Sequence, residues 1–96
     1  TVSQKVLESI ALIDFIIKHY PHIYENLSEV TLNSNDEFVL ILADYPTKVI
    51  LGTERMQEKI QILDSFEQAL PNQKGLYHFS ILDLRYNRQI IARERV

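Results

Sequence analysis

The sequence contains no cysteine, no tryptophan and only two glycines in 96 residues. Without cysteine, the chain has no disulfide framework, no thiolate zinc site and no thiol nucleophile. Gly52 and Gly75 are too few for the glycine-rich loops of Walker and Rossmann nucleotide sites. The longest apolar run, Phe38–Ala43, is far shorter than the roughly 20 residues that span a bilayer. The sequence therefore predicts no nucleotide-binding loop, no thiol chemistry and no membrane helix within this chain.

The composition indicates one small globular domain over residues 1–96. Hydrophobic residues make up 46% and charged residues 24% of the chain, which is typical of a packed core under a solvated surface. The formal net charge of −3 disfavours nucleic acid as the main partner, because phosphate binding needs a basic face. The chain begins at Thr1 rather than methionine and has no signal peptide. We therefore expect a piece of a longer protein, whose membrane anchor or targeting segment lies outside it.

The first segment, residues 2–20, has the apolar periodicity of an amphipathic helix. Either Thr1 or Ser3 is suited to cap its start. Pro21 is expected to end it, because proline lacks a backbone N–H and clashes with the preceding turn. Leu7, Phe15 and Ile16 widen the apolar face into a broad stripe that needs something to pack against. The centre of this stripe is formed by residues at spacings of three and four: Val6, Ile10, Ile13 and Ile17.

Residues 22–51 change to the alternation of polar and apolar residues that is typical of β-strands. Turn-forming residues at Asn33–Asp36 and Asp44–Thr47 divide this region. The continuous apolar run in its middle indicates a strand that is central in the sheet or covered on both faces. The simplest arrangement is an antiparallel meander of strands around Val30–Leu32, Phe38–Ala43 and Lys48–Leu51.

The second half of the chain predicts a helix followed by two strands. Gly52 ends the preceding strand, and Thr53 is suited to cap the helix. A strand over Tyr77–Arg85, a turn at Tyr86–Gln89 and a strand over Ile90–Val96 follow. The fold class is α+β, with two amphipathic helices packed on a largely antiparallel sheet of about five strands in the order α-β-β-β-α-β-β. The apolar face of the second helix comprises Met56, Ile60, Leu63, Phe66 or Glu67, and Leu70.

None of the titratable clusters predicts an active site. His19 and His22 have a metal-like H-x-x-H spacing, but Pro21 separates them across a helix end and no third ligand is indicated. His78 is expected to be a packed or surface strand residue. We therefore expect no catalytic residue, no metal site, no cofactor and no enzymatic activity. The carboxylate pairs expected on the solvated face of the second helix are Asp64 with Glu67, and Glu54 with Glu58.

Four arginines lie close together near the C-terminus, at positions 85, 88, 93 and 95. Three interpretations remain open. They can form a patch for an anionic ligand or lipid headgroup, they can protect an edge strand by charge, or they can help an edge select a partner strand. One competing hypothesis is therefore a small α+β domain, cytosolic or exported, that binds an anionic small molecule through Arg85, Arg88 and Arg93.

Two motifs carry a family resemblance. Val49–Gly52, with the sequence VILG, runs directly into an amphipathic helix, and Ile81–Tyr86, with the sequence ILDLRY, follows one helix and one loop later. This arrangement resembles the C-terminal β domain of the bacterial cell-division protein family FtsQ, called DivIB in Gram-positive bacteria. Loosely, the resemblance extends from about Val6 to Arg93. Its specific part is the set Leu51, Gly52, Asp83, Leu84, Arg85 and Tyr86.

The resemblance implies a non-enzymatic scaffold of the divisome that binds FtsB and FtsL during septum formation. Family proteins carry one membrane helix and a POTRA domain before this domain, and neither is expected within residues 1–96. The resemblance also implies a position on the extracytoplasmic, periplasmic face of the cytoplasmic membrane, held there by the parent's own membrane helix.

The resemblance further implies that a segment of FtsB adds to the last strand as an open sheet edge. Tyr86 is the matched position at the entrance to the last hairpin. Asp83 and Arg85 have the same parity on one strand, so they are expected to share a face and fix the hairpin. The family often carries a tryptophan-bearing tail, which this chain lacks. The remaining partner-binding candidates, assigned by location, are Arg88, Gln89, Ile90, Ile91, Ala92 and Arg93.

Overall fold

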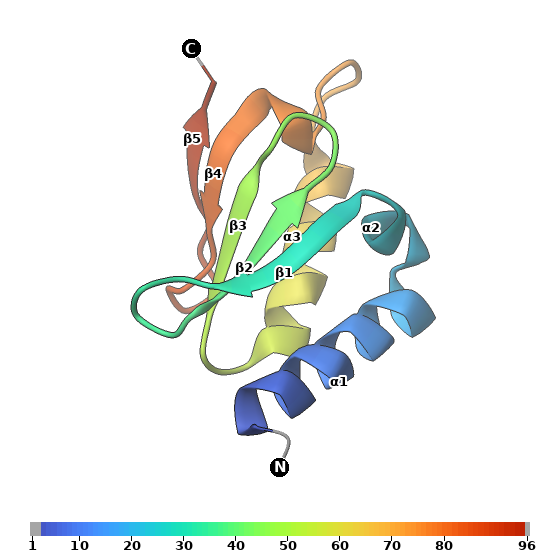
Figure 1. The fold of residues 1–96 in the computed structure, drawn as a ribbon. Coiled ribbons are helices and arrows are strands. Elements are labelled where there is room, and N and C mark those ends of the chain that lie inside the picture. The colour runs from blue at the N-terminus through green and yellow to red at the C-terminus, as the bar shows by residue number, and fades with distance from the viewer. Residues whose placement is uncertain (1–2, 96) are drawn as a thin grey trace.

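The computed structural model describes residues 3–95 and contains three α-helices and five strands (Figure 1). The order is the predicted α-β-β-β-α-β-β once the two leading helices are taken together, so the α+β class is confirmed. The bounds are α1 Gln4–His19, α2 Pro21–Glu25, β1 Leu27–Leu32, β2 Phe38–Leu42, β3 Lys48–Gly52, α3 Met56–Ala69, the 3₁₀ turn Leu76–His78, β4 Phe79–Asp83 and β5 Ile91–Glu94.

The strands form one sheet in the order β1-β2-β3-β4-β5. All neighbouring pairs are antiparallel except β3 and β4, which run parallel. The parallel pairing follows from α3, because a helix that connects two strands across a face of the sheet lets both strands run in the same direction. The run that begins at Phe38 forms β2, between β1 and β3, as its continuous apolar character predicts.

The leading helix buries only one side of the predicted apolar stripe, the side that contains Ile16. Ser3 caps α1 as expected, since its Oγ accepts from the Val6 N–H at 3.2 Å, whereas Thr1 lies outside the described residues. Leu12 and Ile16 are the buried residues of α1. The helix stops at His19, and the predicted breaker becomes the first residue of the short helix α2. Three members of the predicted core face are exposed: Val6, Ile10 and Ile17.

Helix α3 packs as predicted but begins later. Ile60 and Leu63 are fully buried, which confirms the apolar face. The N-cap is Arg55 in a left-handed conformation (φ 56°) and no side chain caps the helix, so the prediction of a Thr53 cap is wrong. The left-handed residue redirects the chain before the first helical turn.

The hydrophobic core lies between the helices and the sheet. Residues from α1, α2, α3 and strands β2, β3 and β4 form one cluster. No helix within residues 3–95 is long and apolar enough to cross a bilayer. The cluster comprises Leu12, Ile16, Ile23, Phe38, Leu40, Leu42, Val49, Leu51, Ile60, Leu63, Leu76, Phe79, Leu82 and Leu84.

Candidate functional site

β5 forms one free edge of the sheet, opposite the edge formed by β1 (Figure 1). Within residues 3–95 it pairs on one side only, antiparallel to β4, through pairs that include Leu82↔Ala92 and Asp83↔Ile91. All four β5 residues are exposed, and Ile91 has 54% of its surface accessible. Such an edge presents unpaired backbone N–H and C=O groups to which another strand can add.

The backbone hydrogen bonds of β5 indicate which groups point outward. The Arg95 N–H donates to the His78 carbonyl at 2.9 Å, and the Arg93 carbonyl accepts from the Ser80 hydroxyl at 3.3 Å. Both arginines therefore direct backbone groups toward β4. Since successive residues of a strand direct their backbone groups to alternate sides, the residues with outward backbone groups are Ala92 and Glu94.

The side chain of Arg95 secures the C-terminal end of β5. Its Nε donates to the Tyr77 carbonyl at 2.9 Å, and its Nη2 lies 3.2 Å from the carbonyls of Tyr45 and Phe79. The same Nη2 donates at 3.2 Å to the hydroxyl of Thr47, which is fully buried and donates in turn to the Phe79 carbonyl at 2.7 Å. These bonds connect β5 to two loops, so the free edge rests on an anchored strand.

The residues before β5 form a turn rather than part of the edge. The Gln89 N–H donates to the Tyr86 carbonyl at 3.3 Å, and Arg88 is left-handed with φ 55°. Tyr86 is 49% exposed, with the Arg85 guanidinium 5.9 Å from its ring centre. Ile90 is half-buried and packs on the core. Of the partner-binding candidates, only residues 91–93 lie on the free edge, whereas residues 86–90 lead into it.

The C-terminal arginines do not form one cluster. Arg85 is paired with Asp83 at 2.6 Å and with Glu37 at 3.2 Å. Arg88 and Arg93 make no side-chain hydrogen bond or ion pair with other residues of the described chain. The charges of Arg88 and Arg93 are therefore free for a partner, whereas Arg85 stabilises the fold.

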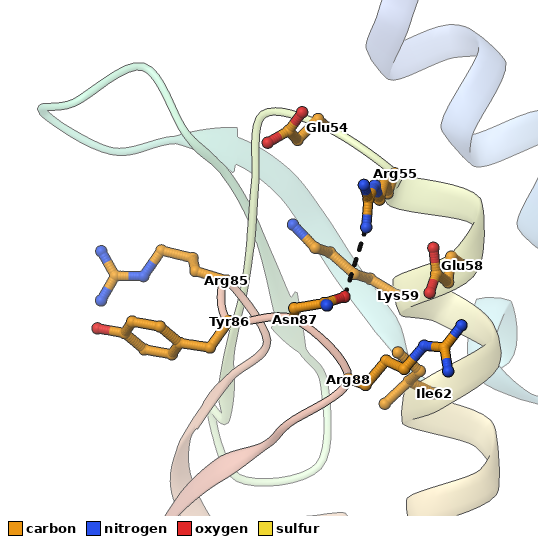
Figure 2. Close-up of a pocket in the computed structure, with 9 residues that line it drawn as sticks. All are labelled: Glu54, Arg55, Glu58, Lys59, Ile62, Arg85, Tyr86, Asn87 and Arg88. Carbon is orange, nitrogen blue, oxygen red and sulfur yellow. Dashed lines mark hydrogen bonds between the residues drawn. The ribbon is translucent and has the colours of Figure 1, made fainter.

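A pocket of about 260 Å³ lies between the start of α3 and the turn before β5 (Figure 2). Arg55 and Asn87 close one side, with Nη1 and Oδ1 at 3.4 Å. The lining has carboxylates as well as cations, and Arg93 is not part of it. Two of the three arginines in the hypothesis of an anion site, Arg85 and Arg88, therefore line this pocket, and the third does not. The lining residues are Glu54, Arg55, Glu58, Lys59, Ile62, Arg85, Tyr86, Asn87 and Arg88.

The Leu-Gly motif forms the connection from β3 toward α3. Leu51 is fully buried, and its carbonyl accepts from Nζ of the buried Lys59 at 2.6 Å. Gly52 has φ +90°, a conformation that side chains disfavour. A Cβ at this glycine would lie 3.2 Å from the Lys59 Nζ and 3.4 Å from the Arg85 Cγ. The glycine therefore permits both the turn and the close approach of two cationic side chains.

The Asp-Leu-Arg motif forms a local ion pair at the end of β4. Asp83 Oδ1 accepts from the Arg85 backbone N–H at 3.0 Å and from its Nε at 2.9 Å, and Oδ2 accepts from Nη2 at 2.6 Å. Leu84 is buried, and its N–H donates to the Ile50 carbonyl at 2.9 Å. Through Glu37, Arg85 also joins the β1–β2 turn to the start of the last hairpin. These motif residues thus organise the base of that hairpin.

Arg85 lowers the pKa of Asp83, chiefly through its side-chain hydrogen bonds, while burial of the carboxyl opposes the shift. A carboxyl whose pKa is lower in the folded than in the unfolded chain stabilises the fold above its unfolded pKa. That contribution is lost as the pH falls through the folded pKa. We expect Asp83→Asn to cost about 1–3 kcal/mol of unfolding free energy at pH 7 and progressively less below about pH 4.

Urea denaturation of wild type and Asp83→Asn at a series of pH values tests this expectation. Asp44→Asn is the matched control, because Asp44 is exposed and forms no ion pair with the described residues. A stability difference for Asp83→Asn that stays constant from pH 7 to acidic pH would contradict the assignment.

Two residues at the end of the last strand, Glu94 and Arg95, were not among the partner-binding candidates, although the predicted strand Ile90–Val96 contains both. Glu94 continues β5 and pairs with Lys74 at 3.0 Å. The sequence signal available for Glu94 was its place within the predicted last strand. The side-chain bonds of Arg95 had no such signal, because their carbonyl partners come from distant loops. Val96, the predicted end of the strand, lies outside the described residues.

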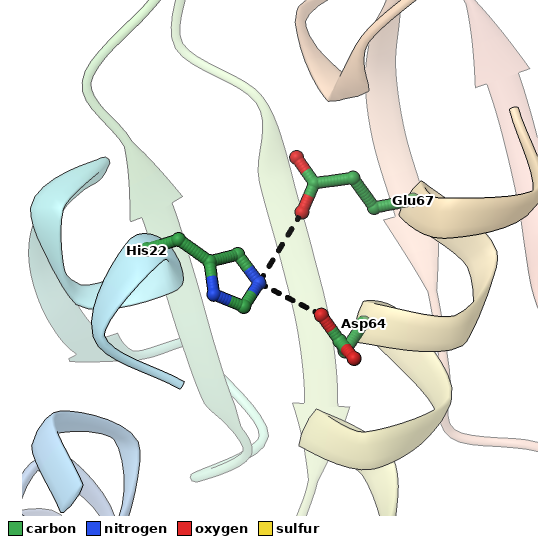
Figure 3. Close-up of side chains that lie close together, drawn as sticks. All are labelled: His22, Asp64 and Glu67. Atoms are coloured by element: carbon green, nitrogen blue, oxygen red, sulfur yellow. Dashed lines mark hydrogen bonds and ion pairs between the residues drawn. The ribbon is translucent and has the colours of Figure 1, made fainter. Parts of the chain in front are cut away.

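His19 and His22 contact different groups, and His22 has partners that the sequence did not predict. His19 packs its ring on Phe15, with ring centres 4.8 Å apart. His22 instead contacts the carboxylates of Asp64 and Glu67 on α3 (Figure 3). The pairing of His22 with carboxylates 42 or more residues away leaves no local sequence signal.

Comparison with known proteins gives one family. No curated protein matches the chain. Residues 1–93 match the family described as FtsQ/DivIB, C-terminal related, which confirms the resemblance carried by the two motifs. The chain therefore belongs to the FtsQ/DivIB C-terminal related family, a cell-division family of the divisome and not a known enzyme family.

Proposed function

We propose that residues 1–96 are a single FtsQ/DivIB-type β domain that acts as a non-catalytic scaffold during septum formation. In this proposal a segment of FtsB adds to β5 as a further strand, and FtsL joins through the same complex. The parent protein holds the domain on the periplasmic face of the cytoplasmic membrane by a helix outside these residues. The family match supports the cell-division role.

The observation that carries the proposal is the free edge at β5. Its four residues are exposed, and its outer side has no partner strand within residues 3–95. Strand addition supplies main-chain hydrogen bonds, and side chains on alternate positions supply selectivity. Long exposed edges invite unwanted pairing, and a strand that is short, charged and anchored suits controlled pairing with one partner.

The side chains around the edge favour an acidic partner with an apolar residue. Ile91 offers an exposed apolar surface, and the unpaired charges of Arg88 and Arg93 flank it. Rim charges chiefly accelerate association and select partners rather than add affinity. The bonds of Arg95 hold the strand in place before the partner arrives, which lowers the ordering cost of binding.

Isothermal titration of the chain with the extracytoplasmic segment of its FtsB tests the proposal. We expect saturable one-to-one binding that weakens as salt is raised, because the free arginines are screened. A scrambled segment of the same composition is the control. Absence of saturable binding to a folded chain, or equal binding of the scrambled segment, would overturn the proposal.

A further inference from the structure

Helices α2 and α3 bring three potential metal ligands together at the protein surface. The i, i+3 spacing of Asp64 and Glu67 places both carboxylates on the face of α3 that meets α2. His22 extends from α2 toward them (Figure 3). Its Nε2 lies 2.7 Å from Asp64 Oδ1 and 3.8 Å from Glu67 Oε1, and one ligand atom from each residue lies within 4.8 Å of the others.

We propose that His22, Asp64 and Glu67 bind a zinc ion, with water completing a four-coordinate site. Zinc accepts imidazole nitrogen and carboxylate oxygen, and it commonly takes three protein ligands and one open position. This proposal stands independently of the role proposed for β5, because it uses a different face and a different ligand.

The distances suit a tetrahedral ion after small side-chain rotations. Bonds of about 2.0–2.1 Å at tetrahedral angles separate neighbouring ligand atoms by about 3.3 Å. The Nε2–Oδ1 distance of 2.7 Å must lengthen and the Nε2–Oε1 distance of 3.8 Å must shorten, each by roughly half an ångström. The terminal torsions of Asp64 and Glu67 are soft and permit such changes.

The charge balance also favours a dication. The two carboxylates carry negative charge that Zn²⁺ neutralises. Within residues 3–95, His22 is the only basic side chain within 4.0 Å of either carboxylate. A bound cation relieves the repulsion between the two acids.

The site is accessible and includes an aromatic neighbour. The side chains of His22, Asp64 and Glu67 are 47%, 23% and 32% exposed, so an ion and a water can enter. The Tyr20 ring stands edge-on to the imidazole, with ring centres 6.2 Å apart. A metal here would also tie the short helix α2 to α3.

Zinc titration of the 96-residue chain, followed by calorimetry and by the ¹⁵N shift of the His22 Nε2, tests the site. We expect one-to-one binding, a shift of that nitrogen, and a rise in the thermal unfolding temperature that Mg²⁺ does not produce. Asp64→Asn and Glu67→Gln are each expected to weaken zinc binding by at least about tenfold. Circular dichroism in EDTA checks that both variants fold.

His19→Gln and Glu58→Gln are the matched controls, since each removes a comparable group outside the cluster. They are expected to leave zinc affinity unchanged. Equal affinity of the Glu67→Gln variant, loss of affinity in His19→Gln, or no zinc-dependent change of the His22 nitrogen would overturn the proposal.

Discussion

Ala92→Pro is expected to weaken binding of the FtsB segment by at least about tenfold while the domain remains folded. Ala92 lies in β5 with its backbone groups directed away from β4, so proline removes an N–H that the partner needs and not one that the sheet uses. A buried carbonyl left without its donor costs about 1–3 kcal/mol, and the proline ring also blocks the approaching strand. We therefore expect an affinity loss of at least about tenfold.

Isothermal titration measures this loss, and Leu32→Pro is the matched control on the opposite edge. Leu32 belongs to β1, and the Asn33 N–H next to it bonds inward to the Glu37 carbonyl at 3.0 Å. By alternation, the Leu32 N–H points outward from the sheet. This control is expected to bind normally. Unchanged affinity of a folded Ala92→Pro variant would contradict strand addition at β5.

Gly52→Ala is expected to destabilise the fold by about 1–3 kcal/mol, because a non-glycine residue is strained at its φ of +90°. The added Cβ also meets the Lys59 Nζ at 3.2 Å, and this Nζ already donates to the Leu51 carbonyl at 2.6 Å. A shift of the buried ammonium weakens that bond. Urea denaturation gives the change in the unfolding free energy.

Ser65→Ala on the exposed surface of α3 is the control for the effect of changing one small side chain elsewhere in the domain. Alanine suits a helix better than serine, so the control is expected to keep or slightly raise stability. A Gly52→Ala variant as stable as wild type would show that the positive φ is not required at the end of β3.

The sequence predicted most of the elements because their patterns are unambiguous. The apolar face of α3 repeats at helical spacing between polar residues, and Ile60 and Leu63 are buried accordingly. The buried face of α1 was predictable only in part, because Ile16 belongs to the predicted stripe and Leu12 does not. Apolar residues cover most of that helix, so periodicity offers two faces, and contacts with the rest of the fold select the one that contains Leu12 and Ile16.

The sites were predictable only where they follow from chain order or family motifs. The resemblance indicated the last strand as the edge, and β5 is the edge. The bonds of Arg95 to distant carbonyls and the contact of His22 with α3 depend on tertiary packing. Neither contact has a local spacing that the sequence displays. The backbone at Arg55 likewise adopts a left-handed conformation that the residue types of Thr53 and its neighbours do not predict.

Amide hydrogen exchange of β5, measured by NMR with and without the FtsB segment, tests strand addition most directly. The outward amides of Ala92 and Glu94 are expected to exchange readily in the free domain, because they have no acceptor in the sheet. Strand addition predicts strong protection of these two amides in the complex, with little change on the β1 edge. Binding that leaves both amides unprotected would contradict the account.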